Sequence, residues 1–275
     1  MLSTIYQIKI ENMPNHLKIS SSLLLLSLVA LPLLPLQGGE KISFTQTRQK
    51  HSSSSLSSSI KEFSFQPSDE EEILLESLFT DPDLFESPEK MKEAGFIVNR
   101  RVHEELMVAT HPLLKKYIFK KYTNKIPHEV QLAKYIHRIN GARIIETHLT
   151  KYKFKHLVVP KKWIYPLPSH YGEESYLVVA EYLPICKGDD HRSGENGQRY
   201  YNMSKEVLKE LIYLMHKLGG CDAWPRNQPF TKDGKIAFVD TEHVGEKKRH
   251  FARHIIPRLN PDLQKYANGL LRKLK

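Results

Sequence analysis

Two aspartates and an asparagine in the last quarter of the chain form the pattern with the clearest chemical potential. Asp222 and Asn227 are separated by four residues, and Asp240 follows the apolar strand predicted for residues 236–239. Between them, Asp233-Gly234 is typical of a β-hairpin turn. Carboxylate and amide oxygens bind divalent cations, and a carboxylate can also accept the proton of a hydroxyl group. The structural alternative is that Asp222 and Asn227 only cap and close a turn.

This arrangement resembles the catalytic loop and metal-binding segment of the protein-kinase-like superfamily, including its small-molecule and lipopolysaccharide kinase branches. The proline three residues after Asp222 also matches that loop. The resemblance implies a phosphotransferase that uses ATP with Mg²⁺ or Mn²⁺. Asp222 would orient the attacking hydroxyl of the acceptor, while Asn227 and Asp240 would hold the metal against the phosphates.

Two further segments occur in the order expected for this superfamily. Leu214-Met-His216 resembles the Leu-His that precedes the catalytic loop, and Val178–Leu183 resembles the hinge whose backbone binds adenine. The resemblance therefore implies that Glu181 and Leu183 contact the nucleotide. It covers roughly residues 95–245, about half of the chain.

The resemblance also implies a strand lysine that contacts the α- and β-phosphates. Tyr117-Ile-Phe-Lys120 is similar to the Val-Ala-Ile-Lys pattern, so Lys120 is the candidate, and Lys121 should point to the opposite face. A solvated basic strand is the alternative interpretation. The glutamate partner of Lys120 would be Glu129 or, if the next helix continues past Gly141, Glu146. Glu129 is slightly preferred.

Several features depart from the superfamily pattern. No Gly-x-Gly-x-x-Gly precedes the lysine strand, and residues 102–112 contain no glycine. Gly220-Cys221 replaces the usual His-Arg pair, and Asp240-Thr-Glu242 replaces Asp-Phe-Gly. About 35 residues follow Asp240, so the helices that bind protein substrates in ordinary kinases are largely missing. Three hypotheses stay open: an active kinase with an unknown acceptor, a catalytically inactive pseudokinase, and an unrelated secreted interaction module.

Composition limits the choice of partners. The chain has 275 residues, 40% of them hydrophobic, with a formal net charge of +10 and a pI near 9.3. Such a charge favours an acidic partner, but no zinc spacing, RNP-type motif or Arg-rich recognition helix supports nucleic acid. The expected partners are a nucleotide, a phosphoryl acceptor and a host or membrane-associated molecule. Cys186 and Cys221 make neither a disulfide framework nor a metal site.

The N-terminal segment predicts export. An apolar run over residues 19–36, interrupted by Pro32 and Pro35, is too short for a comfortable membrane span and predicts a signal peptide over residues 1–38. The protein would then be secreted or extracytoplasmic. A membrane anchor formed by the uncleaved segment is the alternative.

The predicted fold class is α+β, a two-lobed protein-kinase-like fold with a truncated C-terminal lobe. Residues 39–67 are serine-rich and predict a disordered linker, and residues 68–94 predict short helices, the first of which begins with a capping box at Ser68. The kinase-like domain would span residues 95–275, with an N-lobe over 95–180 and a C-lobe over 184–275.

Periodicity predicts the elements within that domain. Strands are expected in 96–98, 106–109, 116–122, 157–159, 163–165, 176–183 and 236–239. A helix begins at Pro127 and either ends at Gly141 or continues beyond it, and a second helix runs from Ser204 to Lys217. Residues 189–197 are polar and predict a surface loop.

Overall fold

The computed structural model describes residues 60–99, 105–123, 126–172, 175–186 and 194–274. The predicted signal peptide and most of the predicted linker lie outside these described residues. Within the described part of the chain, no helix has the length and apolar character needed to cross a membrane.

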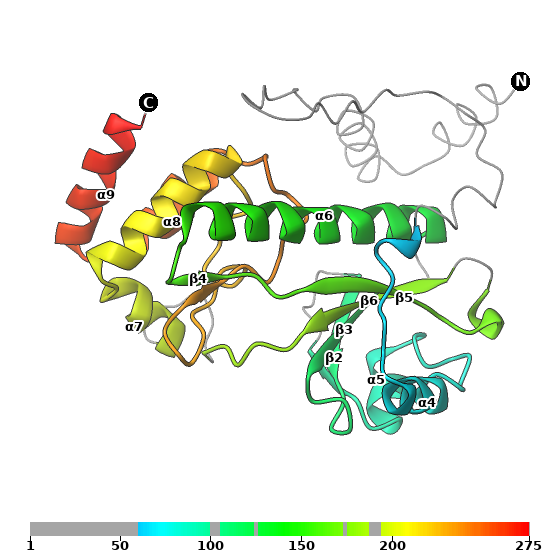
Figure 1. Ribbon diagram of the computed structural model, residues 1–275. Coiled ribbons are helices and arrows are strands. Elements are labelled where there is room, and N and C mark those ends of the chain that lie inside the picture. The colour runs from blue at the N-terminus through cyan, green and yellow to red at the C-terminus, as the bar shows by residue number, and fades with distance from the viewer. Residues whose placement is uncertain (1–59, 100–104, 124–125, 173–174, 187–193, 275) are drawn as a thin grey trace, which may run out of the picture. The chain divides into compact units, whose positions relative to one another are not determined.

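A five-stranded antiparallel sheet holds the strands in the order β1-β2-β3-β6-β5 (Figure 1). The strands are β1 (Ile97–Asn99), β2 (Leu106–Thr110), β3 (Tyr117–Tyr122), β5 (Lys162–Pro166) and β6 (Tyr176–Glu181). Lys120 of β3 and Ile164 of β5 both pair with Val178 of β6. Because residues directly opposite each other in a sheet share a face, these three side chains belong to the same face.

The two faces of the sheet pack against different helices. Val178 belongs to one apolar cluster with Tyr135 and Ile139 of α6 (His128–Tyr152). Its neighbours Leu177 and Val179 belong to another cluster, beside α4 (Asp69–Leu78) and α5 (Pro88–Glu93). This alternation follows from the two-residue period of a strand, and it places α6 on one side of the sheet and α4 and α5 on the other (Figure 1).

The helix α6 continues through Gly141 to Tyr152, and a neighbouring segment passes very close to that glycine. A Cβ atom at Gly141 would lie 1.9 Å from the backbone oxygen of Thr241. Gly141 therefore marks the place where α6 meets the chain just after Asp240, and this resolves the alternative that the sequence left open.

The C-terminal half is mainly helical. It contains α7 (Glu195–Tyr201), α8 (Lys205–Leu218), α9 (Pro261–Lys273) and two strands that pair in parallel, β4 (Leu157–Val158) and β7 (Ile236–Ala237). Short turns of helix are η1 (Ser169–Tyr171), η2 (Phe251–Ile255) and η3 (Ile256–Arg258).

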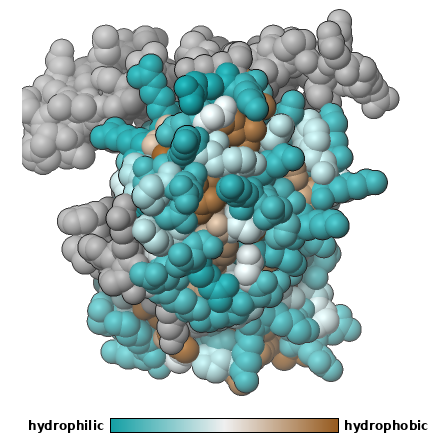
Figure 2. Space-filling view, turned by 90° about the vertical axis from the view of Figure 1, so that its left-hand side faces the viewer, coloured by the Kyte–Doolittle hydropathy of each residue, from teal (hydrophilic) through white to brown (hydrophobic). Residues whose placement is uncertain are grey.

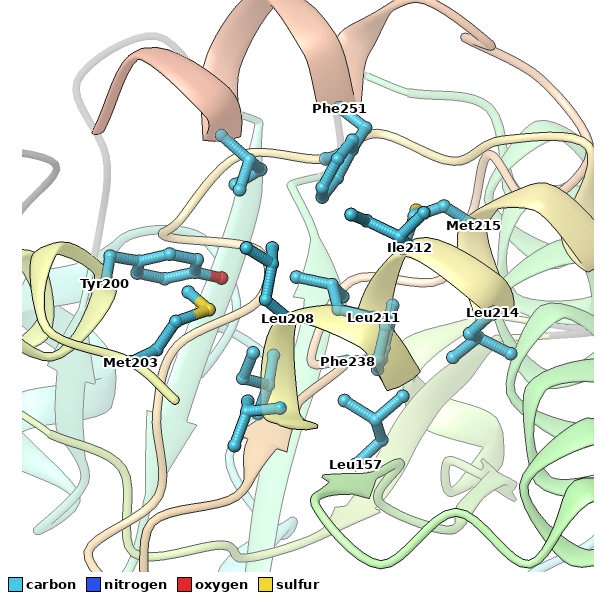
Figure 3. Close-up of a cluster of buried hydrophobic side chains, with 14 of the residues drawn as sticks. Leu157, Tyr200, Met203, Leu208, Leu211, Ile212, Leu214, Met215, Phe238 and Phe251 are labelled. Atoms are coloured by element: carbon cyan, nitrogen blue, oxygen red, sulfur yellow. The ribbon is translucent and has the colours of Figure 1, made fainter. Parts of the chain in front are cut away.

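The core of this half is built around α8. Figure 3 shows Leu208, Leu211 and Ile212 of α8 between side chains from the other segments. Phe238 and Phe251, which lie on either side of Asp240 in the sequence, belong to the same cluster. The helix α8 therefore supports both the segment that leads to Asp240 and the segment that follows it.

Three predictions about elements need correction. The linker does not extend to residue 67: Phe63 and Phe65 are buried, and their backbones exchange two hydrogen bonds of 2.7 Å with Ile164 of β5. The predicted loop over residues 189–197 ends inside α7, which begins at Glu195. The final predicted strand is shortened to the two residues of β7. Helices α7 and α9 were not predicted.

The other elements agree with the sequence, and the α+β class is confirmed. Ser68 and Glu71 form the expected capping box, since each side chain accepts from the backbone N–H of the other residue. Helices α4 and α5 belong to the same compact unit as the rest of the described chain.

Candidate functional site

Asp222 and Asn227 lie together in the loop that follows α8. The Nδ2 atom of Asn227 donates to the Oδ2 atom of Asp222 at 3.1 Å and to its backbone oxygen at 3.2 Å. Two glycines with positive φ, Gly219 (70°) and Gly220 (108°), turn the chain from the helix into this loop. The backbone oxygen of Asn227 accepts from the N–H of Val239 at 3.0 Å. This hydrogen bond places the residue before Asp240 against the loop that carries Asp222 and Asn227.

Two lysines reach the backbone next to Asp240 from the sheet. The Nζ atom of Lys120, on β3, donates to the Val239 oxygen at 3.1 Å, and the Nζ atom of Lys162, on β5, donates to the same oxygen at 3.2 Å. Lys162 also donates to the Oγ1 atom of Thr241 at 2.6 Å. Sequence reasoning identified Lys120 but missed Lys162, although a lysine two residues before the core residue Ile164 was an available signal.

Burial and neighbouring charges set the ionisation of this group. Lys162 is buried, which holds its pKa well below the usual value; the nearby charge of Lys120 adds to this effect, and Asp240 opposes it. For Asp240 the balance is reversed. Burial raises its pKa, but Arg138, Lys120 and Lys162 together outweigh that effect and bring the pKa to about 2. Asp240 is therefore a carboxylate at neutral pH.

The helix α6 contributes cations to the site. The Nη1 atom of Arg138 is 2.7 Å from the Oδ1 atom of Asp240, and its Nη2 atom pairs with Glu242 and donates to the Tyr122 hydroxyl at 3.1 Å. Lys134, one turn earlier, pairs with Glu242 at 3.2 Å. These carboxylates outweigh the effect of burial and raise the pKa of Arg138.

The glutamates expected to pair with Lys120 lie elsewhere. Glu129 and Glu146 are both exposed on α6, and neither contacts Lys120. The face of α6 that meets residues 240–242 consists instead of Arg138, which pairs with Asp240 and Glu242, Lys134, which pairs with Glu242, and Gly141, which lies against Thr241. The spacing of these three residues is present in the sequence, but the sequence alone does not show that this face of the helix meets the site.

The solvated-strand interpretation of β3 is wrong for two of its lysines. Lys120 is 8% exposed and Lys121 is 3% exposed. The Nζ atom of Lys121 donates to the Oε1 atom of Gln131 at 2.6 Å, and burial lowers the pKa of Lys121 to about 8. Lys115 and Lys116, which precede the strand, are exposed.

The predicted hinge is partly engaged in the sheet. The N–H groups of Glu181 and Tyr182 donate to the carbonyls of Lys161 and Lys116, at 2.9 and 2.7 Å. The exposed side chain of Glu181 accepts from the N–H of Lys161 at 3.3 Å. An adenine ring bound against this segment would therefore meet backbone groups from Leu183 onward, because the N–H groups of Glu181 and Tyr182 are already used in the sheet.

A histidine that sequence spacing did not connect to the site contacts Asp222. The Nδ1 atom of His250 is 2.8 Å from the Oδ1 atom of Asp222. The ring of His254 lies edge-on to the ring of His250, with 4.9 Å between the ring centres, and stacks on the ring of Trp224, with 3.6 Å between the ring centres. The guanidinium of Arg226 lies 5.0 Å from the centre of the Trp224 ring. Both oxygens of Asp222 thus have hydrogen-bond partners that fix the direction of the carboxylate.

The oxygen atoms near Asp240 suit a hard divalent cation whose remaining coordination positions are filled by phosphate and water. Mg²⁺ is commonly held by one or two protein oxygens together with substrate phosphates, and the second oxygen of Asp240 and the amide oxygen of Asn227 are of this type. No group of three or more His, Cys, Asp or Glu side chains gathers as a metal site among the described residues.

A surface groove in the described part of the chain lies away from these residues. It has a volume of about 630 Å³ and runs between the start of α8 and α9, where Met203, Leu263 and Leu270 alternate with Lys205, Lys265 and Lys273. Figure 2, which views the α9 side, shows a mostly hydrophilic surface with short apolar strips. In comparisons with known proteins, no family model and no curated relative matches this chain.

Proposed function

We propose that the described part of the chain is a protein-kinase-like domain that binds ATP with a divalent cation and transfers its γ-phosphoryl group to an acceptor hydroxyl. One observation carries the proposal: Lys120 and Asn227 both hydrogen-bond to the backbone of Val239, next to Asp240. A lysine from the third strand of an antiparallel sheet, an asparagine in a loop and a carboxylate shortly after a strand are the groups that a protein kinase brings together.

Each residue has a defined part in the transfer. Asp222 accepts the proton of the acceptor hydroxyl, whose oxygen forms a bond to the γ-phosphorus. The bond from that phosphorus to the β–γ bridging oxygen breaks, and ADP leaves with the electron pair. Lys120 attracts the α- and β-phosphates, while His250 and Asn227 keep the carboxylate of Asp222 in place. Asp240 and Asn227 would hold the metal, which would neutralise the charge that develops on the phosphates.

Nucleotide binding without transfer is the second candidate, and one observation favours it. Arg138 approaches Asp240 from α6, at 2.7 Å, where the kinase pattern has a glutamate that pairs with the strand lysine. Metal binding must therefore compete with Arg138 for the carboxylate. A pseudokinase could use Arg138, Lys120 and Lys162 to attract phosphates with no metal.

Thermal unfolding of the full chain with ATP, with and without Mg²⁺ or Mn²⁺, tests the proposal. A ligand that binds only the folded state adds about 2.7 kcal/mol at a hundred times its Kd. We expect metal-dependent stabilisation that Asp240→Asn abolishes and Asp222→Asn preserves. Asp233→Asn, which changes an exposed carboxylate in the adjacent hairpin, is the matched control and should behave as the wild type.

Two other outcomes distinguish the candidates. Stabilisation by ATP that is independent of metal and is lost in Lys120→Met would favour the pseudokinase. A folded protein that ATP does not stabilise under any metal condition would contradict both candidates. Transfer itself is measured as ADP formation, which should fall to background in Asp222→Asn while ATP binding persists.

A further inference from the structure

The segment that follows Asp240 places a dense positive charge beside Asp222. Residues 243–258 carry five Lys or Arg residues and one glutamate. That glutamate, Glu246, is 3.0 Å from the Nδ1 atom of His243. Lys247, Lys248, Arg249 and Arg253 are exposed, and none forms an ion pair with another described residue. The positive charge of the segment is therefore available to a ligand.

Close backbone contacts hold this segment against the Asp222 loop. The N–H of Gly245 donates to the oxygen of Gly220 at 2.9 Å. A Cβ atom at Gly220 would lie 2.5 Å from the oxygen of Glu246 and 2.8 Å from the nitrogen of Lys248. Together with the contact between His250 and Asp222, these approaches fix the basic segment next to the candidate base rather than leaving it as a distant surface patch.

The Asp222 loop adds a guanidinium of its own. Arg226 is exposed, and its guanidinium lies over the indole of Trp224, which also stacks against His254. A cation held over an aromatic ring loses less freedom when it binds an anion. Arg226 is thus a preorganised group on the loop that carries the proposed base.

We propose that the acceptor is a phosphorylated polyol, either free or as a lipid headgroup, bound at an acceptor surface that consists of Arg226, Lys247, Lys248, Arg249 and Arg253. The inference rests on the proposed function, because it places the attacking hydroxyl at Asp222. Guanidinium groups bind phosphate in a bidentate manner, and a polyol supplies a hydroxyl close to its phosphate. An extended peptide is disfavoured because it would lie in a groove or along a sheet edge, whereas these cations flank one half-buried carboxylate; an acidic peptide, which Arg clusters can also bind, is an outcome of the test.

Calorimetry on the full chain tests the surface with myo-inositol hexakisphosphate, which has no hydroxyl to react, and with uncharged myo-inositol. The variant Arg249→Gln/Arg253→Gln removes two guanidinium groups that lie one helical turn apart, as shown by the 3.0 Å hydrogen bond from the Arg253 nitrogen to the Arg249 oxygen. The control Lys115→Gln/Lys116→Gln removes the same charge from the exposed turn before β3.

We expect the wild type and the control to bind the hexakisphosphate, the double arginine variant to bind it about tenfold or more weakly, and none to bind myo-inositol. Equal affinity in the variant and the control would overturn the proposal. So would a polyglutamate peptide that binds as tightly as the hexakisphosphate, because charge alone would then explain binding.

Vesicles separate the two sources of the polyol. Phosphatidylcholine vesicles that contain phosphatidylinositol bisphosphate are compared with vesicles that contain phosphatidylserine at equal charge. Binding only to the former, with no consumption of a soluble inositol trisphosphate, assigns a lipid headgroup, whereas phosphorylation of the soluble compound assigns a free polyol. Equal binding to both vesicles, with no soluble compound bound, overturns the proposal.

Failure of the acceptor surface and failure of the proposed function give different results. Stabilisation by ATP and metal should persist in Arg249→Gln/Arg253→Gln. If it persists in a wild-type protein that binds no polyphosphate, only the acceptor inference fails. If the wild type binds polyphosphate but not ATP, the proposed function fails, and with it the role of the surface in phosphoryl transfer.

Discussion

The guanidinium of Arg138 and the carboxylate of Asp240 form an ion pair of 2.7 Å that joins the middle of α6 to the end of the segment leading from β7. The side chain of Arg138 is 7% exposed and also pairs with Glu242. This one residue therefore pairs with two carboxylates, each of which also has at least one lysine nearby.

Replacing Arg138 with methionine should destabilise the fold. Removing one partner of a buried ion pair leaves the other charge uncompensated, but Asp240 is partly exposed and keeps Lys120 and Lys162 nearby. We expect a loss of about 2–4 kcal/mol in the free energy of unfolding, measured with urea. Arg143→Met, on the same helix but in an exposed pair with Glu62, should cost less than about 1 kcal/mol. Equal losses would show that the Asp240 pair contributes little.

Adding one methyl group at Gly141 should be far more damaging than adding one at Gly269. At Gly141 the new carbon would overlap the Thr241 oxygen, so α6 must move away from the site, at a cost of more than about 2 kcal/mol. A Cβ atom at Gly269, in α9, would meet nothing within 4 Å, and alanine there should stabilise the helix by about 0.5–1 kcal/mol. Thermal unfolding of the two variants checks the contrast, and similar melting temperatures would argue against the close contact.

The buried Lys121 should make stability rise with pH between about 8 and 10. Its pKa in the folded state is about 8, below the unfolded value of about 10.4. In this window the unfolded chain binds more protons, so raising the pH favours the folded state. Melting temperatures at pH 7.5 and pH 9.5, corrected with a Lys121→Met variant, isolate this contribution. Between pH 7.5 and pH 9.5, the melting temperature of the variant should rise less, or fall more, than that of the wild type.

Neither cysteine should react with a thiol reagent in the folded protein. Cys186 and Cys221 are each 3% exposed. Burial raises the pKa of the Cys221 thiol to about 12, and the Nε2 atom of Gln228 lies 3.0 Å from its sulfur. Because the thiolate is the reactive form, labelling at pH 8 should be negligible without denaturant and should reach both thiols in urea. Fast labelling of the native protein would indicate that the packing around Cys221, next to Asp222, opens readily.

The larger sheet could be predicted from the sequence because its signal is local. Short apolar and alternating runs indicate each of its five strands, including β3 with Lys120 and β6 with Val178. The spacing of Asp222 and Asn227 also corresponds to a direct side-chain contact. Features that depend on a short stretch of residues are therefore visible in the sequence alone.

The remaining features depend on contacts between distant segments. Gly141 of α6 is approached by Thr241, a hundred residues later, and the ionic partner of Asp240 lies on that same helix. His250 has no distinguishing sequence context and becomes part of the site only because the chain returns to Asp222. Helix α7 is polar enough to resemble a loop in sequence. Helix α9 has an N-cap at Asn260, a proline in its first turn and an apolar face that packs on the α8 core, so its sequence signal was present but missed.

The strand-like contact of Ser64 with Ile164 has a consequence for handling the protein. Residues 63–65 cover the outer side of β5, the last strand of the sheet, through two backbone hydrogen bonds and the ring of Phe65 against Trp163. A protein trimmed beyond this segment would present an uncovered apolar strand edge, which is a template for aggregation. Expression boundaries for this domain belong before Ile60, since a start at residue 67 would remove the cover from β5 and lower solubility.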